Sequence, residues 1–391
     1  MTEFHLDFQD TATAFADRSD SQLKEKYRLF KMLNSPFLNS LGSKAATFAL
    51  SLGLPVTGII KDTVFKEFCG GESVEECEDT VAMLAKANIG SILDYSVEGK
   101  STEQDFDRTK HEIVKTIDRA KGDPRIPFSV FKVSGIAPLG TLERLSAKKK
   151  LDAKSQAKCE RIFNRVHEIC EHAYAAGQPV FIDAEESWIQ EAIDRLATEM
   201  MEKYNRERPI VYNTLQMYRT DRLQYLKDSR RQAKADGYIY AVKLVRGAYM
   251  EKERERAAEM GYPSPIHVNK ASTDADYDAA IDYCMKHRNM VAFVAATHNE
   301  ASTHRLASMM ESGGIAHDDP HIYFSQLYGM GDNISYVLGK HGYNVSKYVP
   351  FGPVADAIPY LIRRAEENSS AAGQVSRELQ MIEREMKRRK L

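Results

Sequence analysis

The chain has 391 residues, of which 43% are hydrophobic and 28% are charged, as is ordinary for a soluble globular protein with a sizeable core. Its formal net charge of −2 excludes a global basic field that would recruit nucleic acid. The five cysteines are scattered and form no CxxC motif, so we expect a reduced compartment, no disulfide framework and no cysteine metal site.

The first 88 residues show no alternation of strands and helices, and we predict a helical N-terminal region over 1–88. The acidic N-terminus resembles neither a secretory signal nor an arginine-rich transit peptide. An uncharged stretch over 45–60 is interrupted by Gly53 and Pro55 and is too short to span a bilayer. Its length and breakers favour a buried helix–turn–helix over a surface that contacts a membrane or a partner.

From Asn88 onward, short β-branched runs alternate with amphipathic helical segments. Eight such strands indicate an α/β fold of the (β/α)8 TIM type over 89–370, followed by a helical basic tail over 371–391. A doubly wound sheet is the alternative, but no GxGxxG motif follows any strand. The strand-like runs are Ile89–Tyr95, Ile126–Gly135, Pro179–Asp183, Pro209–Leu215, Ile239–Val245, Val291–Thr297, His321–Gln326 and Val345–Val349.

Polar side chains stand at the end of nearly every predicted strand. In TIM barrels the active site lies at the carboxyl ends of the strands, so these residues are expected at one mouth. A metal is disfavoured because HExxH is absent, and the GxSxG and GxxxxGK[ST] motifs are absent too. The strand-end residues are Asp94, Tyr95, Glu98, Lys132, Ser134, Asp183, Glu185, Glu186, Gln216, Tyr218, the segment Lys243–Tyr249, Thr297, His298, Asn299, Gln326, Tyr328 and Tyr348.

Two segments carry arginines suited to anionic ligands. On a helix, Tyr360, Arg363, Arg364 and Glu367 share one face, and the two guanidiniums form a fork for a small carboxylate. An exposed amphipathic helix with an ion pair between Arg363 and Glu367 is the alternative.

The second segment, Lys243–Tyr249, places Lys243 and Arg246 beside Gly247, which permits close backbone approach to a phosphate or an electron-rich ring. A Schiff-base lysine of an aldolase barrel, at Lys132 or Lys243, is a competing interpretation.

Four motifs resemble the proline dehydrogenase family of flavoenzymes, which oxidise L-proline to Δ1-pyrroline-5-carboxylate. The resemblance covers about 88–370 and implies a (β/α)8 barrel whose last helix lies over the mouth, with FAD as cofactor. The motifs are Phe181–Glu186 (FIDAEE), Lys243–Tyr249 (KLVRGAY), Ala296–Asn299 (ATHN) and Tyr360–Asn368 (YLIRRAEEN).

The resemblance also implies roles for individual residues. Lys132, Arg363 and Arg364 match the cations that hold the substrate carboxylate, and Leu244, Tyr249, Tyr348 and Tyr360 match the walls around the ring. Asp183 matches a required aspartate near Lys132, Lys243 stands beside the flavin, and Glu98 matches an acid that pairs with the first arginine and gates the pocket. The flavin contacts match Ala184, Gln216, Arg246, Gly247, Ala248, Thr273, Thr297, His298 and Glu367. No metal is implied.

Two positions depart from the bacterial bifunctional members of this family. Lys243 stands where those members have arginine, and Met250 stands where they have tryptophan, so the chain is similar to the eukaryotic-type branch. Hydroxyproline dehydrogenase is the nearest alternative, although Tyr348 would crowd a ring hydroxyl. More distant alternatives are a flavin barrel of the methylenetetrahydrofolate reductase type and a non-enzymatic binder that exposes Tyr360–Asn368.

The resemblance further implies that electrons pass to a membrane quinone. We therefore expect a peripheral membrane contact on the inner face of the cell membrane of a cytoplasmic protein, with 45–60 and the basic tail Lys387–Lys390 as candidates. The 391 residues leave no room for an aldehyde dehydrogenase half, so the product is expected to pass to a separate pyrroline-5-carboxylate dehydrogenase.

Overall fold

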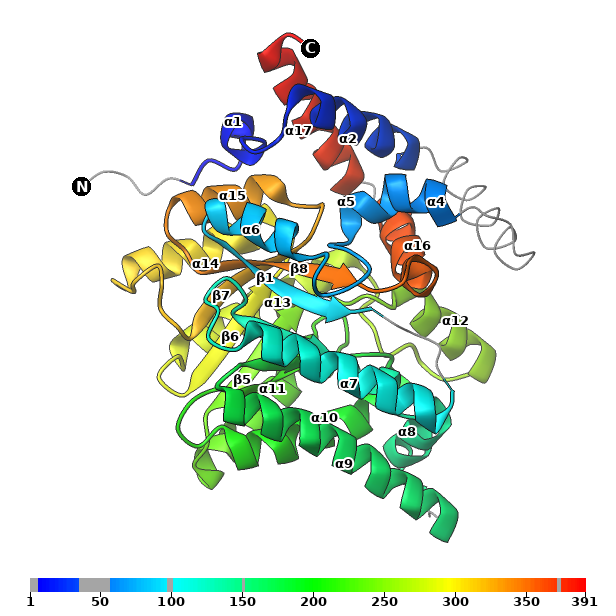
Figure 1. Ribbon diagram of the computed structural model, residues 1–391. Helices are drawn as coiled ribbons and strands as arrows, with labels where there is room; N and C mark the ends of the chain where they lie inside the picture. Colours follow the sequence, from blue (N-terminus) through cyan, green and yellow to red (C-terminus); the bar gives the residue numbers. More distant parts are fainter. Residues whose placement is uncertain (1–5, 35–56, 97–100, 150–151, 371–373) are drawn as a thin grey trace. The chain divides into compact units, whose positions relative to one another are not determined.

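Eight parallel strands close into a barrel in chain order in the computed structural model, which describes residues 6–34, 57–96, 101–149, 152–370 and 374–391 (Figure 1). The predicted α/β class and (β/α)8 barrel are confirmed. The strands are β1 (Ile89–Tyr95), β2 (Phe128–Phe131), β3 (Val180–Ile182), β4 (Val211–Gln216), β5 (Tyr240–Val245), β6 (Val291–Ala296), β7 (Ile322–Leu327) and β8 (Val345–Phe351).

The second strand is shorter than predicted. It ends at Phe131, and Val133–Gly135 form a single 3-10 turn in which the backbone N–H of Gly135 donates to the carbonyl of Lys132 at 3.2 Å. Serine and glycine are weak strand formers, so the chain leaves the sheet at this point. Ser134 therefore lies on a turn and not, as the sequence predicted, within a strand.

Helices follow the strands, and several begin with a polar side chain that caps the first turn. Thr102, Asp152, Asn269 and Asn299 each accept a hydrogen bond from a backbone N–H of the first turn, which satisfies a donor that has no partner inside the helix. The helices after β1 are α7 (Glu103–Ala120), α8 (Leu139–Ser146), α9 (Ala153–Ala176), α10 (Ser187–Tyr204), α11 (Arg222–Asp236), α12 (Met250–Met260), α13 (Lys270–Lys286), α14 (Glu300–Ser312), α15 (Asp332–Lys340), α16 (Val354–Ser370) and α17 (Gln374–Arg389).

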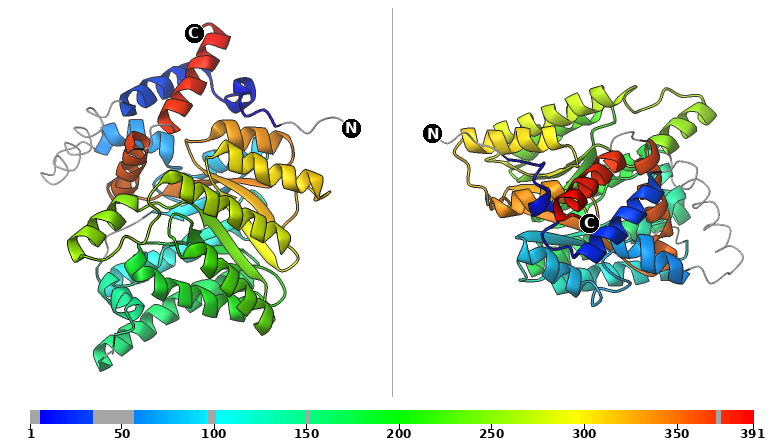
Figure 2. Two further views of the ribbon diagram at one scale, coloured as in Figure 1. Left: turned by 180° about the vertical axis from the view of Figure 1, so that it is seen from behind. Right: turned by 90° about the horizontal axis from the view of Figure 1, so that it is seen from above.

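The chain divides into two compact units, and the larger comprises residues 99–325. Its strands are buried on both faces, and every residue of β4 is buried. Such strands require a helix layer outside and a packed interior, as expected of a parallel barrel. Figure 2 shows the green and yellow helices of this unit lying outside the strands of the same colours.

The smaller unit comprises residues 1–98 and 326–391. Its core joins the two ends of the chain, since Phe30 of α2 and Ile382 of α17 belong to one hydrophobic cluster with Phe68 and Leu361. The predicted boundaries at 88 and 370 stay a prediction, as does the placement of α16 over the barrel mouth. The helices before β1 are α1 (Thr11–Ala14), α2 (Asp20–Leu33), α4 (Thr57–Ile60), a π-helical turn (Lys61–Phe65), α5 (Lys66–Phe68) and α6 (Glu78–Lys86).

A buried ion cluster ties α2 to the start of α15 in this smaller unit. The Lys26 ammonium donates to Glu67 at 2.6 Å, to Asp332 at 3.0 Å and to the carbonyl of Gly329 at 3.0 Å. Lys347 of β8 donates to the second oxygen of Asp332 at 2.8 Å. Burial alone would raise the pKa of Asp332, but the neighbouring lysines hold it well below its ordinary value.

Part of the predicted N-terminal region lies outside the described residues. Of the predicted helix–turn–helix at 45–60, only Thr57–Ile60 is described, as α4. Within the described ranges, no helix combines the length and the apolar character needed to cross a membrane. All five cysteines carry free thiols.

Candidate active site

Strand register places four polar residues in one row across β2, β3, β4 and β5. Phe131 pairs with Ile182, Ile182 with Asn213, and Asn213 with Val242. The next residue on each strand is Lys132, Asp183, Thr214 and Lys243, so these four stand at one level. Residues in register on neighbouring parallel strands direct their side chains to the same face of the sheet, so these four side chains can contact one another.

The row is held together by ionic contacts. The Lys243 ammonium donates to one carboxylate oxygen of Asp183, and the Lys132 ammonium lies 3.6 Å from the other. The Thr214 hydroxyl donates to Asp183 at 3.4 Å, and the Lys243 ammonium lies 4.8 Å from the centre of the Phe181 ring. Lys243 and Asp183 are only 4% and 7% exposed. The structure thus brings together Lys132, Asp183 and Lys243, three residues singled out in the sequence.

A second row comprises Ser134 on the turn after β2, Glu185 in the segment after β3 and Gln216 at the end of β4, each two residues beyond a member of the first row. Both the backbone N–H of Ser134, at 2.9 Å, and its hydroxyl donate to the Glu185 carboxylate. The Gln216 amide donates to the Glu185 carbonyl at 2.7 Å and accepts from the Ala248 N–H at 3.0 Å.

The sequence identifies Glu185 as a strand-end residue and indicates no role for it. Its side chain is buried, and burial raises its pKa to about 7 although the Ser134 donors act in the opposite direction. The signal in the sequence was its position two residues after Asp183, which directs both side chains to the same side of an extended chain.

Arg246 forms a separate polar centre at the end of β5. Its guanidinium donates to Asp274 at 2.7 Å, to Thr297 at 2.6 Å and to Ser302 at 3.0 Å. The Tyr277 ring lies 4.3 Å from its central carbon, a distance at which a cation is attracted to an aromatic face. The structure thus joins Arg246 to Thr297, and Thr273 precedes Asp274 on α13.

The Tyr218 side chain leaves no space for any residue other than glycine at position 247. The φ of Gly247 is +142°, and a Cβ at this position would lie 2.5 Å from the Tyr218 ring. Both observations exclude larger residues. Contact between Gly247 and a ligand, which the sequence suggested, stays a prediction.

The remaining candidates of the larger unit surround these centres. Leu244 is fully buried on β5, and Tyr249 is buried where α12 begins, with the Lys252 ammonium 5.7 Å from its ring centre. Ala184 and His298 are half-buried at the ends of β3 and β6. Their contacts with a ligand stay predictions.

The arginine-bearing segment forms a helix in the smaller unit, as predicted. Tyr360 and Arg364 of α16 are only 7% and 6% exposed, and the Arg364 guanidinium carbon lies 5.2 Å from the Tyr360 ring centre. Arg363 is half-buried and Tyr348 of β8 is buried. This burial disfavours the alternative of an exposed basic helix.

Two candidate side chains lie outside the described part of the chain, and the relation of the α16 arginines to the first row stays a prediction. Glu98 and the side chain of Glu367 lie outside the described part of the chain. Arg363 and Arg364 belong to the smaller unit, whereas the lysine–aspartate row belongs to the larger one. That both sets bind one ligand stays a prediction.

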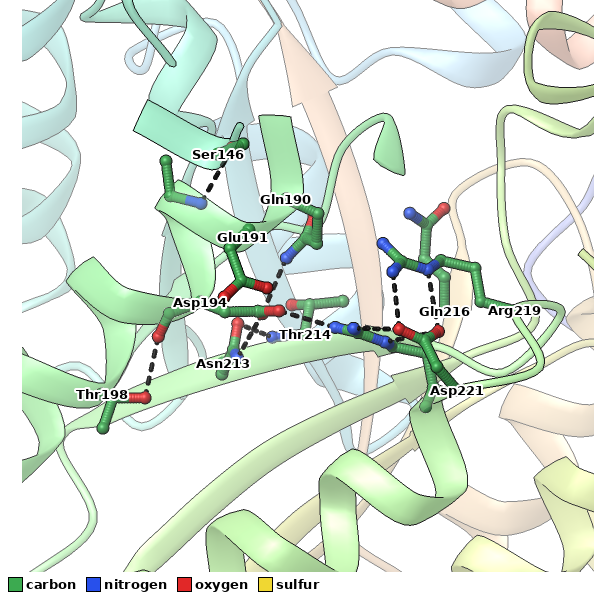
Figure 3. A network of polar contacts seen from close by, with 12 residues as sticks. Ser146, Gln190, Glu191, Asp194, Thr198, Asn213, Thr214, Gln216, Arg219 and Asp221 are labelled. Carbon is green, nitrogen blue, oxygen red and sulfur yellow. Dashed lines mark hydrogen bonds and ion pairs between the residues drawn. The ribbon is translucent and has the colours of Figure 1, made fainter. Parts of the chain in front are cut away.

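Buried polar groups outside the rows support their geometry. Asp194 of α10 accepts from Gln190 at 2.9 Å, from Asn213 at 3.0 Å and from Arg222 at 2.6 Å (Figure 3). The other end of the Gln190 amide accepts from the Glu185 N–H at 2.8 Å. The backbone of the second row is therefore fixed by a network anchored on α10.

Comparisons with known proteins agree with these features. Residues 77–377 match the family model described as proline dehydrogenase. "Proline dehydrogenase 1, mitochondrial" of Arabidopsis thaliana is 33% identical, and the match covers 98% of this chain and 86% of that protein. The Homo sapiens protein of the same name is 38% identical, and the match covers 68% of this chain and 45% of that protein. "Carbapenem antibiotics biosynthesis protein CarD" of Pectobacterium carotovorum subsp. carotovorum is 35% identical over 82% and 83%.

Solved structures show the same fold. Proline utilization A (PutA) from Bdellovibrio bacteriovorus, inactivated by N-propargylglycine, superposes with a TM-score of 0.71 at 20% identity. The match covers 93% of this chain and 38% of that one, so this chain spans about two fifths of the length of that protein. At this identity the likeness supports the fold alone.

Proposed function

Because this chain belongs to the proline dehydrogenase family and is an oxidoreductase that acts on proline, we propose that it transfers a hydride from L-proline to N5 of FAD and releases Δ1-pyrroline-5-carboxylate. The observation that carries this proposal is the row of Lys132, Asp183 and Lys243 at the carboxyl ends of the strands. Two ammonium groups around one carboxylate suit a ligand that brings a further carboxylate.

Proline has a carboxylate, an amine and an apolar ring, and the proposed site has a partner for each part. Lys132, Arg363 and Arg364 would hold the carboxylate, with Arg guanidiniums suited to bidentate pairing. Leu244, Tyr249, Tyr348 and Tyr360 would enclose the ring, and all four are buried. The bulk of Tyr348 supports proline over hydroxyproline, since a ring hydroxyl would need space beside it. Glu98 would pair with Arg363 and close the pocket.

The residues at the ends of β4, β5 and β6 fit a flavin by their chemistry. Arg246 offers a fixed guanidinium, Thr297 a hydroxyl, and Gln216 an amide held against the Ala248 N–H. A flavin has anionic phosphates and a ring edge rich in donors and acceptors, which such groups bind. Ala184, Gly247, Thr273, His298 and Glu367 are the further proposed contacts. When bound, FAD supplies the hydride acceptor.

The contribution of the protein is then mainly orientation and electrostatics. Lys132 and Lys243 are fixed by Asp183, so they require little reorganisation when an anion binds. The substrate amine must lose its proton before the ring carbon is oxidised, and solvent or a nearby tyrosine can accept that proton.

The electrons are proposed to leave to a membrane quinone, which requires a peripheral membrane contact. The candidates remain 45–60 and the basic residues Lys387–Lys390, on a cytoplasmic protein at the inner face of the cell membrane. The product would be consumed by a separate pyrroline-5-carboxylate dehydrogenase. The association with a membrane is supported by two of the named relatives, which are proline dehydrogenases described as mitochondrial.

Substrate comparison tests this proposal. Purified, flavin-loaded protein is supplied with a soluble quinone analogue and with L-proline, trans-4-hydroxyproline or NADH in parallel. We expect rapid turnover with L-proline, slow turnover with hydroxyproline and none with NADH. Faster turnover with hydroxyproline would assign the chain to the sister activity, and turnover with NADH alone would indicate a flavin reductase.

A further inference from the structure

Glu185 occupies a fixed position directly beside the lysine–aspartate row. Its N–H donates to Gln190 at 2.8 Å, and its carbonyl accepts from Gln216 at 2.7 Å. Both backbone polar groups are thus held by side chains from α10 and β4. Ser134, on the turn that follows β2, lies against Glu185, which follows β3.

Ser134 can satisfy Glu185 in either protonation state. Its N–H donates to one carboxylate oxygen at 2.9 Å, and its hydroxyl donates to the other. A hydroxyl can also accept, so a protonated Glu185 can donate to Ser134 Oγ while the N–H contact persists. A change in the protonation of Glu185 therefore alters its charge with little change in geometry.

The charged groups near Glu185 have opposite effects on its pKa. Burial is the main cause that raises its pKa to about 7; Glu186 adds to the rise, and Lys132 opposes it. Glu186 is itself paired with Lys252 of α12 at 2.8 Å. On the α10 side the direct neighbour is the neutral Gln190, and Asp194 beyond it is paired with Arg222 at 2.6 Å.

The charge of the two rows depends on Glu185. Lys132 and Lys243 with Asp183 sum to one positive charge, which an ionised Glu185 cancels and a protonated Glu185 leaves in place. An anionic ligand that approaches Lys132 favours the state with the positive charge. We propose that Glu185 takes up a proton when a carboxylate ligand binds, and so sets the pH dependence of the affinity of this site. This inference rests on the proposed function insofar as the ligand is a carboxylate held by Lys132.

Calorimetric proton linkage tests the inference on the flavin-loaded protein. The probe is tetrahydrofuran-2-carboxylate, an analogue of proline with oxygen in place of the amine, so the ligand has no amine to titrate. At about pH 7, titrations in buffers of different ionisation enthalpy should reveal uptake of a fraction of one proton per site. The Kd should rise above about pH 7, approaching roughly tenfold per pH unit.

Two neutralised variants separate Glu185 from its neighbour. Glu185→Gln mimics the protonated state, because its amide can donate to Ser134 Oγ while its oxygen accepts from the Ser134 N–H. We expect its Kd to be independent of pH and, at about pH 8, several-fold lower than that of the wild type. The matched control Glu186→Gln should retain the pH dependence, with a midpoint shifted to lower pH.

The outcomes distinguish the two proposals. Binding of the analogue to the wild type without proton uptake, or an unchanged pH dependence in Glu185→Gln, overturns the inference alone. Failure of the wild type to bind the analogue overturns the proposed function and this inference with it. If Glu185→Gln does not fold, the buffer dependence measured on the wild type decides.

Discussion

Lys243 and Asp183 form an ion pair across the carboxyl ends of β5 and β3, with Thr214 of β4 between them. The pair is almost completely buried, and Lys132 contacts the second oxygen of the same carboxylate. One aspartate thus contacts both Lys132, proposed to hold the substrate carboxylate, and Lys243, expected beside the flavin. This relationship makes Asp183 the residue whose loss should disturb the site most directly.

Asp183→Asn removes the negative partner of two lysines, one of them buried. Without this carboxylate neither lysine is held in place, and a misplacement of about 1 Å can cost about a hundredfold, so we expect kcat/KM for proline to fall by about that factor. Steady-state kinetics measures the change, and Asp228→Asn, on the exposed face of α11, is the matched control. A kcat/KM equal to that of the control would contradict the assigned role.

Arg364→Met tests the carboxylate role of α16. A ligand carboxylate left without one of its cations loses about 2–5 kcal/mol of binding, which raises the KM for proline by at least about thirtyfold. Flavin absorbance should stay intact. The control is Arg384→Met on α17, where the arginine is exposed. Loss of flavin together with a normal KM would show that Arg364 serves the cofactor instead.

Asp274→Asn tests whether Asp274 fixes the Arg246 guanidinium in the position that binds the flavin. Without its charged partner the guanidinium keeps Thr297 and Ser302 but loses an ion pair. We expect FAD to bind the apoprotein about tenfold more weakly, as measured by quenching of flavin fluorescence. Asp282→Asn, which removes the exposed partner of Arg305, is the control. Equal affinities in both variants would speak against the proposed position of the flavin.

Lys26→Met tests the buried cluster of the smaller unit. Removal of the ammonium leaves the buried Asp332 and the half-buried Glu67 with one cation fewer, and the free energy of unfolding should fall by about 3–5 kcal/mol. Lys24→Met, on the exposed side of α2, should change it by less than about 0.5 kcal/mol. Chemical denaturation followed by circular dichroism compares the two. Similar midpoints would show that the cluster contributes little.

Glu185 should leave a signature in the pH dependence of stability. Its pKa is raised on folding, from the ordinary 4.5 to about 7, so the folded state binds more protons between these values. Stability therefore falls as pH rises through this window, by roughly 3 kcal/mol, since one pKa unit corresponds to about 1.4 kcal/mol. The stability of Glu185→Gln, measured by thermal unfolding between about pH 5 and pH 8, should lack this part of the decline. Parallel stability profiles for wild type and variant would contradict the buried, titrating carboxyl.

The barrel could be predicted because its strands are buried on both faces and are separated by amphipathic helices. Strand identity follows from local composition, and β4 and β5 were predicted to within two residues at each end. The limit appears at β2, where a strand was predicted through Gly135 although the chain turns after Phe131. Residues near Ser134 have weak local preferences, so tertiary hydrogen bonds decide their conformation.

The ionic residues of the first row could be foreseen from the sequence, but the contact between Ser134 and Glu185 in the second row could not. Lys132, Asp183 and Lys243 are charged residues in apolar strands, and such residues are recognisable because burying them requires partners. The contact between Ser134 and Glu185 joins the turn after β2 to the segment after β3, and a contact of this kind follows from tertiary structure and not from local sequence. The partners of Arg246 on α13 and α14 likewise follow from helix packing, which no single motif encodes.

Anaerobic mixing of the purified, flavin-loaded protein with L-proline tests the central claim most directly. The account predicts that the absorbance of the oxidised flavin bleaches and that one equivalent of Δ1-pyrroline-5-carboxylate forms per flavin reduced. An oxidised flavin spectrum that stays unchanged with excess L-proline would contradict it.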